Sequence, residues 1–206
     1  MNGQDNDCPT AETAAATTRA PLPPISPAPF RRDTVARWLH AGFGVAVYAQ
    51  LLLSLSMEVP LPGVPSSGVG QALFKMHEAV GLTIGAFMAI YWLWQLSGRA
   101  NNGIRGLFPW ISRNGRAALA AETRHFLTHR LDDGASRLRV LAGTVHGLGA
   151  TVTTLMAVTG AAMYLAMTPA GALSSLMEAV KHIHGYLAIL LWIYVIGHSP
   201  IGMAMR

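Results

Sequence analysis

The chain has 206 residues, of which 51% are apolar and 12% are charged, and its formal net charge is +5 at pH 7. Soluble domains carry about 25% charged residues, so this composition is typical of an integral membrane protein. The single cysteine, Cys8, excludes a disulfide within the chain, an iron–sulfur cluster held by several cysteines, and covalent attachment of a c-type haem through a cysteine pair.

Residues 1–34 are predicted to be a disordered cytoplasmic tail, and residues 35–206 a single membrane domain. The tail is rich in proline between Pro21 and Pro29, and it contains no apolar run long enough for the central region of a signal peptide. Arg31 and Arg32 follow this segment, whereas the basic residues of a signal peptide come first. We therefore expect no cleaved leader here.

Four apolar stretches have the roughly 17–25 residues that a helix needs to cross the hydrocarbon core of a bilayer. They cover residues 35–57, 73–96, 140–167 and 183–205. The sequence therefore predicts an all-α fold, an integral membrane four-helix bundle.

The basic residues predict the orientation of the bundle. Of the fifteen Lys and Arg residues, only Lys75 and Lys181 lie on the side of the connections 58–72 and 168–182. Since Lys and Arg are retained on the cytoplasmic side, we expect a multi-pass protein of the bacterial inner (plasma) membrane with both termini in the cytoplasm. This asymmetry explains the basic charge without a nucleic-acid partner.

The loop 97–139 is rich in arginine and is predicted to lie on the cytoplasmic side, where it can contact anionic lipid headgroups. Within it, residues 115–131 place apolar side chains among charged ones. This pattern predicts a short helix on the membrane surface.

Four histidines are predicted to lie at two depths. His40 begins the first span and His198 lies near the end of the fourth, close to the cytoplasmic face, whereas His77 and His184 lie near the outer face. His184 precedes His198 by 14 residues, which is about 21 Å along a helix and about 40° short of four full turns. These two histidines therefore share a face. His182 lies about 160° from His198 around the helix, so we exclude it as a ligand.

These depths predict two b-type haems, each held by one imidazole from each of two helices. The predicted axial pairs are His40 with His198 for the inner haem iron and His77 with His184 for the outer haem iron. A planar macrocycle needs room one turn from each ligand. The residues four positions further on are all small: Gly44, Gly81, Ala188 and Gly202. Small residues are also common in ordinary contacts between membrane helices.

A further histidine, His146, lies near the cytoplasmic end of the third span, and by depth alone it could replace His40 or His198 as a ligand. We predict that it instead supports the inner haem or contacts its propionates, because the third span has no second histidine at the outer depth. His125 and His129 lie in the polar loop and are expected to be solvated.

Three motifs are specific enough to compare with a known family. The fourth span has thirteen residues between His184 and His198, the first has Arg37 three residues before His40, and the second has a glycine shortly after His77. With these motifs, roughly residues 35–205 resemble the bacterial cytochrome b561 family. Its members are small di-haem four-helix proteins related to the cytochrome b subunits of hydrogenases and formate dehydrogenases.

The resemblance implies that the same four histidines are the axial ligands. It also implies that His146, which precedes Gly160 by fourteen residues as in the family's third helix, is not an axial ligand. Three features depart from the family's pattern, namely Ala41 in place of a tryptophan, the length of the 97–139 loop and the tail. These departures leave the identity of the electron donor and acceptor undetermined, but they do not affect the expected haem sites.

Several charged residues near the two faces are candidate cofactor contacts. Haem propionates are anionic, so Arg37 and Arg139 at the inner face and Lys75 and Lys181 at the outer face are candidate partners for them. Placement by the positive-inside tendency and interfacial snorkelling explain the same positions. Glu78, at the outer edge, is a candidate proton relay if a quinone reacts there.

The leading prediction is a membrane cytochrome with two haem b groups that carries electrons across the inner membrane, to or from the quinone pool. An alternative is the haem-binding membrane anchor of a larger dehydrogenase or hydrogenase-type complex. The expected partners are membrane lipid, the quinone pool, a redox partner protein and, as a further option, a second copy of the chain as a homodimer.

A hypothesis from another class is a haem-free metal-ion carrier, which needs ligands near the middle of the membrane. Histidine, aspartate, glutamate, lysine and arginine are all missing from the middle of the four spans, at residues 45–53, 83–93, 152–162 and 187–196. This absence argues against a carrier.

Overall fold

The computed structural model describes residues 34–61, 63–65, 67–97, 103–128, 138–168 and 172–204. Residues 1–33 of the predicted tail, His129 and the end of the predicted surface helix lie outside these ranges. The described residues form an all-α bundle, as predicted, with four long helices: α1 (Thr34–Ser56), α2 (Gly68–Leu96), α5 (Arg139–Ala166) and α6 (Ser175–Ala204).

Three of these helices are long and apolar enough to cross a membrane, with apolar segments Gly68–Leu96, Arg139–Ala166 and Ser175–Ser199. In α1 the corresponding described segment is shorter, His40–Ser56. Both α2 and α6 begin earlier than the apolar spans that the sequence predicts. The difference arises because hydrophobicity marks only the apolar part of a helix. The helix itself can begin earlier, where its first amide groups find hydrogen-bond acceptors.

The start of α2 shows such capping. The Ser67 hydroxyl accepts a hydrogen bond from the Gly70 amide at 2.9 Å, as an N-cap residue does. Glu58, in the connection before α2, accepts hydrogen bonds from the Ser67 amide at 2.7 Å and from the Ser67 hydroxyl at 2.8 Å. These polar contacts allow α2 to begin outside the apolar span.

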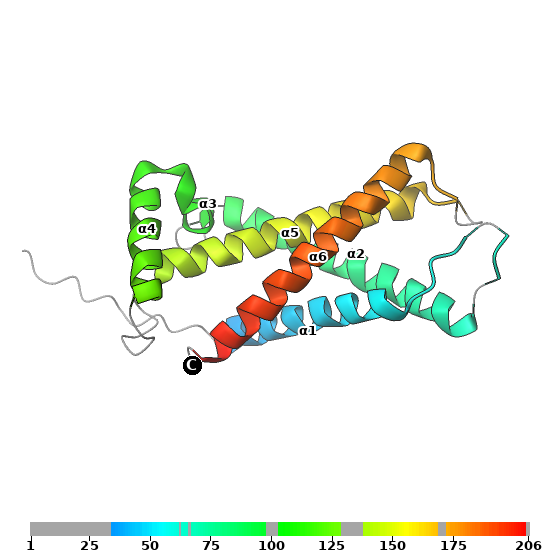
Figure 1. Ribbon diagram of the computed structural model, residues 1–206, viewed down its shortest axis with the longest axis horizontal. Helices are drawn as coiled ribbons and strands as arrows, with labels where there is room; N and C mark the ends of the chain where they lie inside the picture. The colour runs from blue at the N-terminus through cyan, green and yellow to red at the C-terminus, as the bar shows by residue number, and fades with distance from the viewer. Residues whose placement is uncertain are drawn as a thin grey trace, which may run out of the picture.

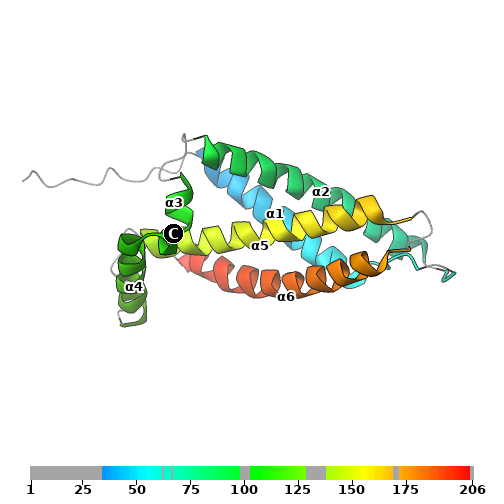
Figure 2. The same cartoon turned by 90° about the horizontal axis from the view of Figure 1, so that it is seen from above.

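The long helices run up and down, so their ends gather at two ends of the bundle. The start of α1 and the end of α6 lie at the same end as two short helices, α3 (Gly103–Leu107) and α4 (Arg113–Thr128) (Figure 1). We call this the inner end. The connections from α1 to α2 and from α5 to α6 lie at the opposite end, the outer end. In the second view α4 stands across the inner end of α5 (Figure 2).

The helix predicted within residues 115–131 is confirmed by α4, which begins slightly earlier. Its Glu122 accepts a hydrogen bond from the Leu141 amide at 2.8 Å, so α4 satisfies one of the free amides in the first turn of α5. Gly143 and Gly147 of α5 lie directly against the backbone of α3, where any side chain would collide. The inner loop is thereby held to the bundle at defined points.

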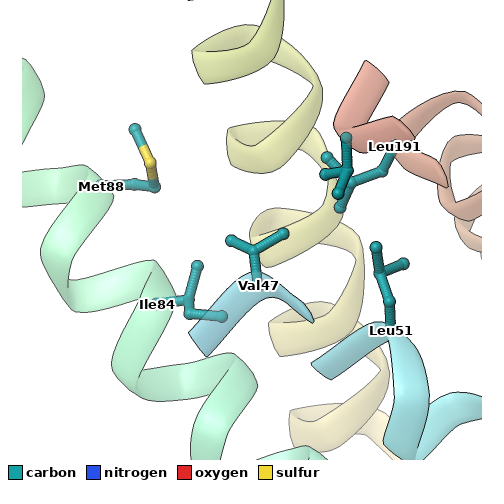
Figure 3. Close-up of a cluster of buried hydrophobic side chains, with 6 residues drawn as sticks. Val47, Leu51, Ile84, Met88 and Leu191 are labelled. Atoms are coloured by element: carbon teal, nitrogen blue, oxygen red, sulfur yellow. The ribbon is translucent and has the colours of Figure 1, made fainter. Parts of the chain in front are cut away.

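A small apolar core lies at the centre of the bundle, between α1, α2 and α6 (Figure 3). Its buried members are Val47, Leu51, Ile84, Met88, Leu191 and Val195. Many other large apolar side chains of the long helices are exposed, for example Leu93 and Leu165. Exposed apolar faces on long helices suit a lipid surround.

Candidate functional site

The structure brings the four predicted ligands together in two groups. At the outer end His77 of α2 faces His184 of α6, with ring centres 6.5 Å apart and ring planes inclined by 76°. At the inner end His40 of α1 faces His198 of α6, with ring centres 6.0 Å apart and planes inclined by 83°. His182 is exposed on α6 and belongs to neither pair.

The inner group contains a third imidazole, that of His146 on α5. Its ring centre lies 5.6 Å from that of His40 and 5.1 Å from that of His198. Ligand nitrogens of the three side chains all lie within 4.8 Å of one another. The Nδ1 atom of His146 lies 2.7 Å from the carbonyl oxygen of Ala142, to which it donates a hydrogen bond. In the neutral form of this imidazole, Nε2 carries the lone pair.

The spacing within each pair suits a metal ion bound between two imidazoles. Because a metal–imidazole bond is about 2 Å long, imidazoles on opposite sides of one metal ion have ring centres about 6 Å apart. The His40–His198 and His77–His184 separations meet this value. The two separations that involve His146 are shorter. The assignment of His40 and His198 as the inner pair stays a prediction, because His146 lies within the same cluster.

The room predicted one turn after each ligand is present at the inner pair but not at the outer pair. The α6 helix packs closely along α5 but much less closely against α1 and α2, which carry the facing histidines. A Cβ atom at Gly44, one turn after His40, would meet no atom within 4 Å, whereas one at Gly81, one turn after His77, would lie 2.9 Å from the side-chain nitrogen of Gln50. Gln50 therefore occupies the space one turn after His77 that a flat group would need, whereas the corresponding space after His40 is open. Gly202 lies outside the residues whose side chains are described.

The outer pair has two different polar surroundings. The Nδ1 atom of His184 lies 2.8 Å from the hydroxyl oxygen of Thr159 on α5. The Gln50 amide of α1 donates a hydrogen bond to the carbonyl oxygen of His77 at 2.8 Å. Among the described residues, Gln50 Oε1 and His77 Nδ1 are buried without a hydrogen-bond partner. Unsatisfied buried polar atoms are rare in folded proteins and often mark functional sites.

The inner pair is supported by aromatic residues that the sequence reasoning missed. Tyr194 stacks on His198, and the Tyr48 hydroxyl lies 2.7 Å from the hydroxyl of Ser199. Tyr194 precedes His198 by one helical turn, so their contact follows from the i to i+4 spacing. Thr159 and Gln50 offered no comparable sequence signal, because each meets its histidine across a helix interface.

The predicted partners of the propionates lie near the two ends, and the structure gives them different environments. Lys75 is exposed on α2, and Arg139 is exposed at the start of α5. Lys181 forms an ion pair with Glu178 on the same helix, at 3.0 Å. The side chain of Arg37 lies outside the described residues. Their contacts with a cofactor stay predictions.

A cavity of about 410 Å³ opens at the outer end, where α2 approaches the end of α5. Three of its lining residues carry polar groups suited to a small polar ring: Lys75, Glu78 and Tyr164. The rest of the lining is partly apolar, from Phe74 and Met167 among others, and partly polar, from Gln71 and Thr168. Lys75 and Glu78 flank His77 in the chain, but His77 and His184 are not among the described residues that line the cavity.

The comparison with protein-family models decides the identity of the bundle. The model described as prokaryotic cytochrome b561 matches residues 31–206. The chain belongs to the prokaryotic cytochrome b561 family. No curated protein and no solved structure matches the chain.

Membership of the cytochrome b561 family establishes the class of protein. It makes the chain a membrane haem b protein of electron transport and confirms the resemblance drawn from the histidine motifs. The donor set fits this cofactor, because neutral imidazoles are the nitrogen ligands of b-type haem and the described residues present them in facing pairs.

Proposed function

We propose that this cytochrome b561 binds two b-type haems, one between His40 and His198 and one between His77 and His184, and carries electrons across the inner membrane. The observation that supports this most directly is the pair of facing imidazoles at each end of α6. The 14-residue spacing along α6 separates the two sites by about 21 Å. Haem, when bound, supplies a one-electron iron couple.

The chain's own residues set the conditions for this transfer. The apolar core, which includes Leu191 and Val195 of α6, lies between the two histidine groups along that helix. Such side chains exclude water from the interval between the cofactors and keep the local polarity low. Since burial and axial ligation tune the potential of a haem, the protein controls both the direction and the driving force of the transfer.

We further propose that a quinone head group binds in the outer cavity. Lys75 and Tyr164 offer hydrogen-bond donors for its carbonyl oxygens, and Glu78 offers a carboxylate that can take up or release a proton. The volume of about 410 Å³ lies within the usual range of small-molecule sites. In this proposal Glu78→Gln slows quinone turnover and leaves both haem spectra unchanged.

The haem content of the purified protein tests the main proposal. A pyridine haemochrome assay should give two b-type haems per chain, and acid–acetone should extract both because no cysteine pair holds them. His77→Ala and His184→Ala should each remove the same haem, whereas His182→Ala, a matched change on α6, should remove neither. A haem content near one or zero in the wild type would refute the di-haem proposal.

A further inference from the structure

Thr159 of α5 makes a hydrogen bond with His184 whose direction can be assigned. Its hydroxyl oxygen lies 2.8 Å from Nδ1 of His184, 2.7 Å from the carbonyl oxygen of Leu155 and 3.1 Å from that of Met156. A hydroxyl has one proton, and a carbonyl oxygen can only accept. The Thr159 proton therefore points to the carbonyls, mainly to that of Leu155. The hydroxyl oxygen accepts from His184, which carries its own proton on Nδ1.

This assignment leaves the Nε2 atom of His184 with the lone pair that a metal requires. A histidine that binds a metal is commonly oriented by a hydrogen bond from its second ring nitrogen, which also strengthens the ligand. We propose that Thr159 is a positioning residue that fixes the tautomer of His184 and lowers the reduction potential of the outer haem. This inference rests on the proposed role of His184 as an axial ligand.

The neighbouring residue on α5 completes the support for the imidazole. A Cβ atom at Gly160 would lie 3.3 Å from Cε1 of His184, so the absence of a side chain lets the ring lie close to the helix. Thr159 and Gly160 together form the part of the α5 surface that contacts the ring of His184. The hydroxyl fixes the rotation of the ring, and the glycine fixes its distance from the helix.

The facing imidazole lacks this support, so the two members of the outer pair are unequal. Within the described part of the chain, Nδ1 of His77 has no hydrogen-bond partner. Donation of a hydrogen bond from Nδ1 increases the electron density that an imidazole gives to iron, which favours the oxidised state. The Thr159 contact with His184, beside a second contact of this histidine with the Met156 backbone, therefore makes the outer haem harder to reduce.

Potentiometric titration of the purified holoprotein tests this inference. In Thr159→Val the midpoint potential of the outer haem should rise by about 59 mV. At a fixed applied potential, this shift raises the ratio of reduced to oxidised outer haem about tenfold. Thr159→Ser keeps the hydroxyl and should restore the wild-type value. The matched control is Thr151→Val, because the Thr151 hydroxyl also bonds to a carbonyl of its own helix, that of Gly147 at 2.8 Å. Among the described residues, no hydrogen bond joins Thr151 to a histidine.

A second readout is the electron paramagnetic resonance signal of the oxidised outer haem, which reports the orientation and strength of its axial ligands. Thr159→Val should move this signal, and Thr159→Ser should not. Selective loss of the outer haem in Thr159→Val, with retention in Thr159→Ser, would support the same role. The inference fails if Thr159→Val leaves potential and signal unchanged, or if Thr151→Val shifts them equally.

His184→Ala separates failure of this inference from failure of the proposed function. If His184→Ala keeps both haems, His184 is not a ligand and the proposed ligand set is wrong. If His184→Ala loses the outer haem while Thr159→Val behaves as the wild type, the ligand set stands and the role of Thr159 is wrong.

Discussion

Tyr194 lies flat against His198 on α6, with the two ring centres 5.1 Å apart and the planes inclined by only 10°. The tyrosine ring also contacts α5 so closely at Gly149 that a side chain there would collide with it. The imidazole is therefore held by a ring that is itself held by the neighbouring helix. This arrangement makes Tyr194 a structural support for the inner site.

Removal of this ring should weaken the inner site. We expect Tyr194→Ala to lose the inner haem about three- to tenfold faster than the wild type, in line with the roughly 0.5–1.5 kcal/mol of an aromatic contact. Tyr194→Phe keeps the stacked ring and should behave as the wild type. Transfer of haem to an excess of an apo-haemoprotein, followed by absorbance, measures the rate. Equal rates for Tyr194→Ala and Tyr194→Phe would contradict the prediction.

The three inner histidines should respond differently to replacement. His40→Ala and His198→Ala should each abolish the low-spin inner haem, because a low-spin b-type haem needs both of its imidazole ligands. His146→Ala should retain the haem and shift only its potential, since the His40–His198 separation suits two axial ligands better than either separation that involves His146. Reduced-minus-oxidised spectra and redox titration distinguish these results. Loss of the haem in His146→Ala with retention in His40→Ala would place the ligand on α5.

The orientation in the membrane can be tested with fused reporters. Thirteen of the fifteen basic residues lie on the side of the tail, the 97–139 loop and the C-terminus. We therefore expect a reporter placed after Arg206 to be active only if it functions in the cytoplasm. A reporter inserted in the outer connection before α2 should show the opposite behaviour. Activity of a periplasmic reporter after Arg206 would reverse the predicted topology.

Glu122 should anchor the inner helix α4 to the bundle. Its carboxylate accepts the hydrogen bond from the Leu141 amide, so Glu122→Ala leaves an amide in the first turn of α5 without this acceptor. We expect a loss of about 1 kcal/mol of stability, as for the loss of a helix cap. Glu178→Ala is the matched control, because its partly exposed ion pair with Lys181 should contribute little.

Thermal unfolding in detergent, together with limited proteolysis of the inner loop, measures both variants. The Glu122→Ala protein should unfold at a lower temperature and be cleaved faster near α4. If Glu178→Ala destabilises the protein as much as Glu122→Ala does, the contact between α4 and α5 has no special role.

The pattern of α6 shows how far a sequence can predict this site. Helical periodicity predicts that His184 and His198 share one face of the helix. The same rule predicts that His182 points away from that face. Both are local properties of one helix, so they needed no knowledge of the other helices. The helix beginnings were less predictable, because capping by residues such as Glu58 and Ser67 lies outside the apolar pattern.

By itself, the sequence determined the membrane class, the four long helices, the family and the two depths of histidine, because hydrophobicity and helical spacing are encoded locally. Only the tertiary structure decided which residues meet these histidines from other helices. Thr159, Gln50 and the third imidazole of His146 reach their partners through the rotation and packing of α1 and α5. Rotation and packing depend on the summed contacts of the whole bundle, and no single segment of sequence contains them.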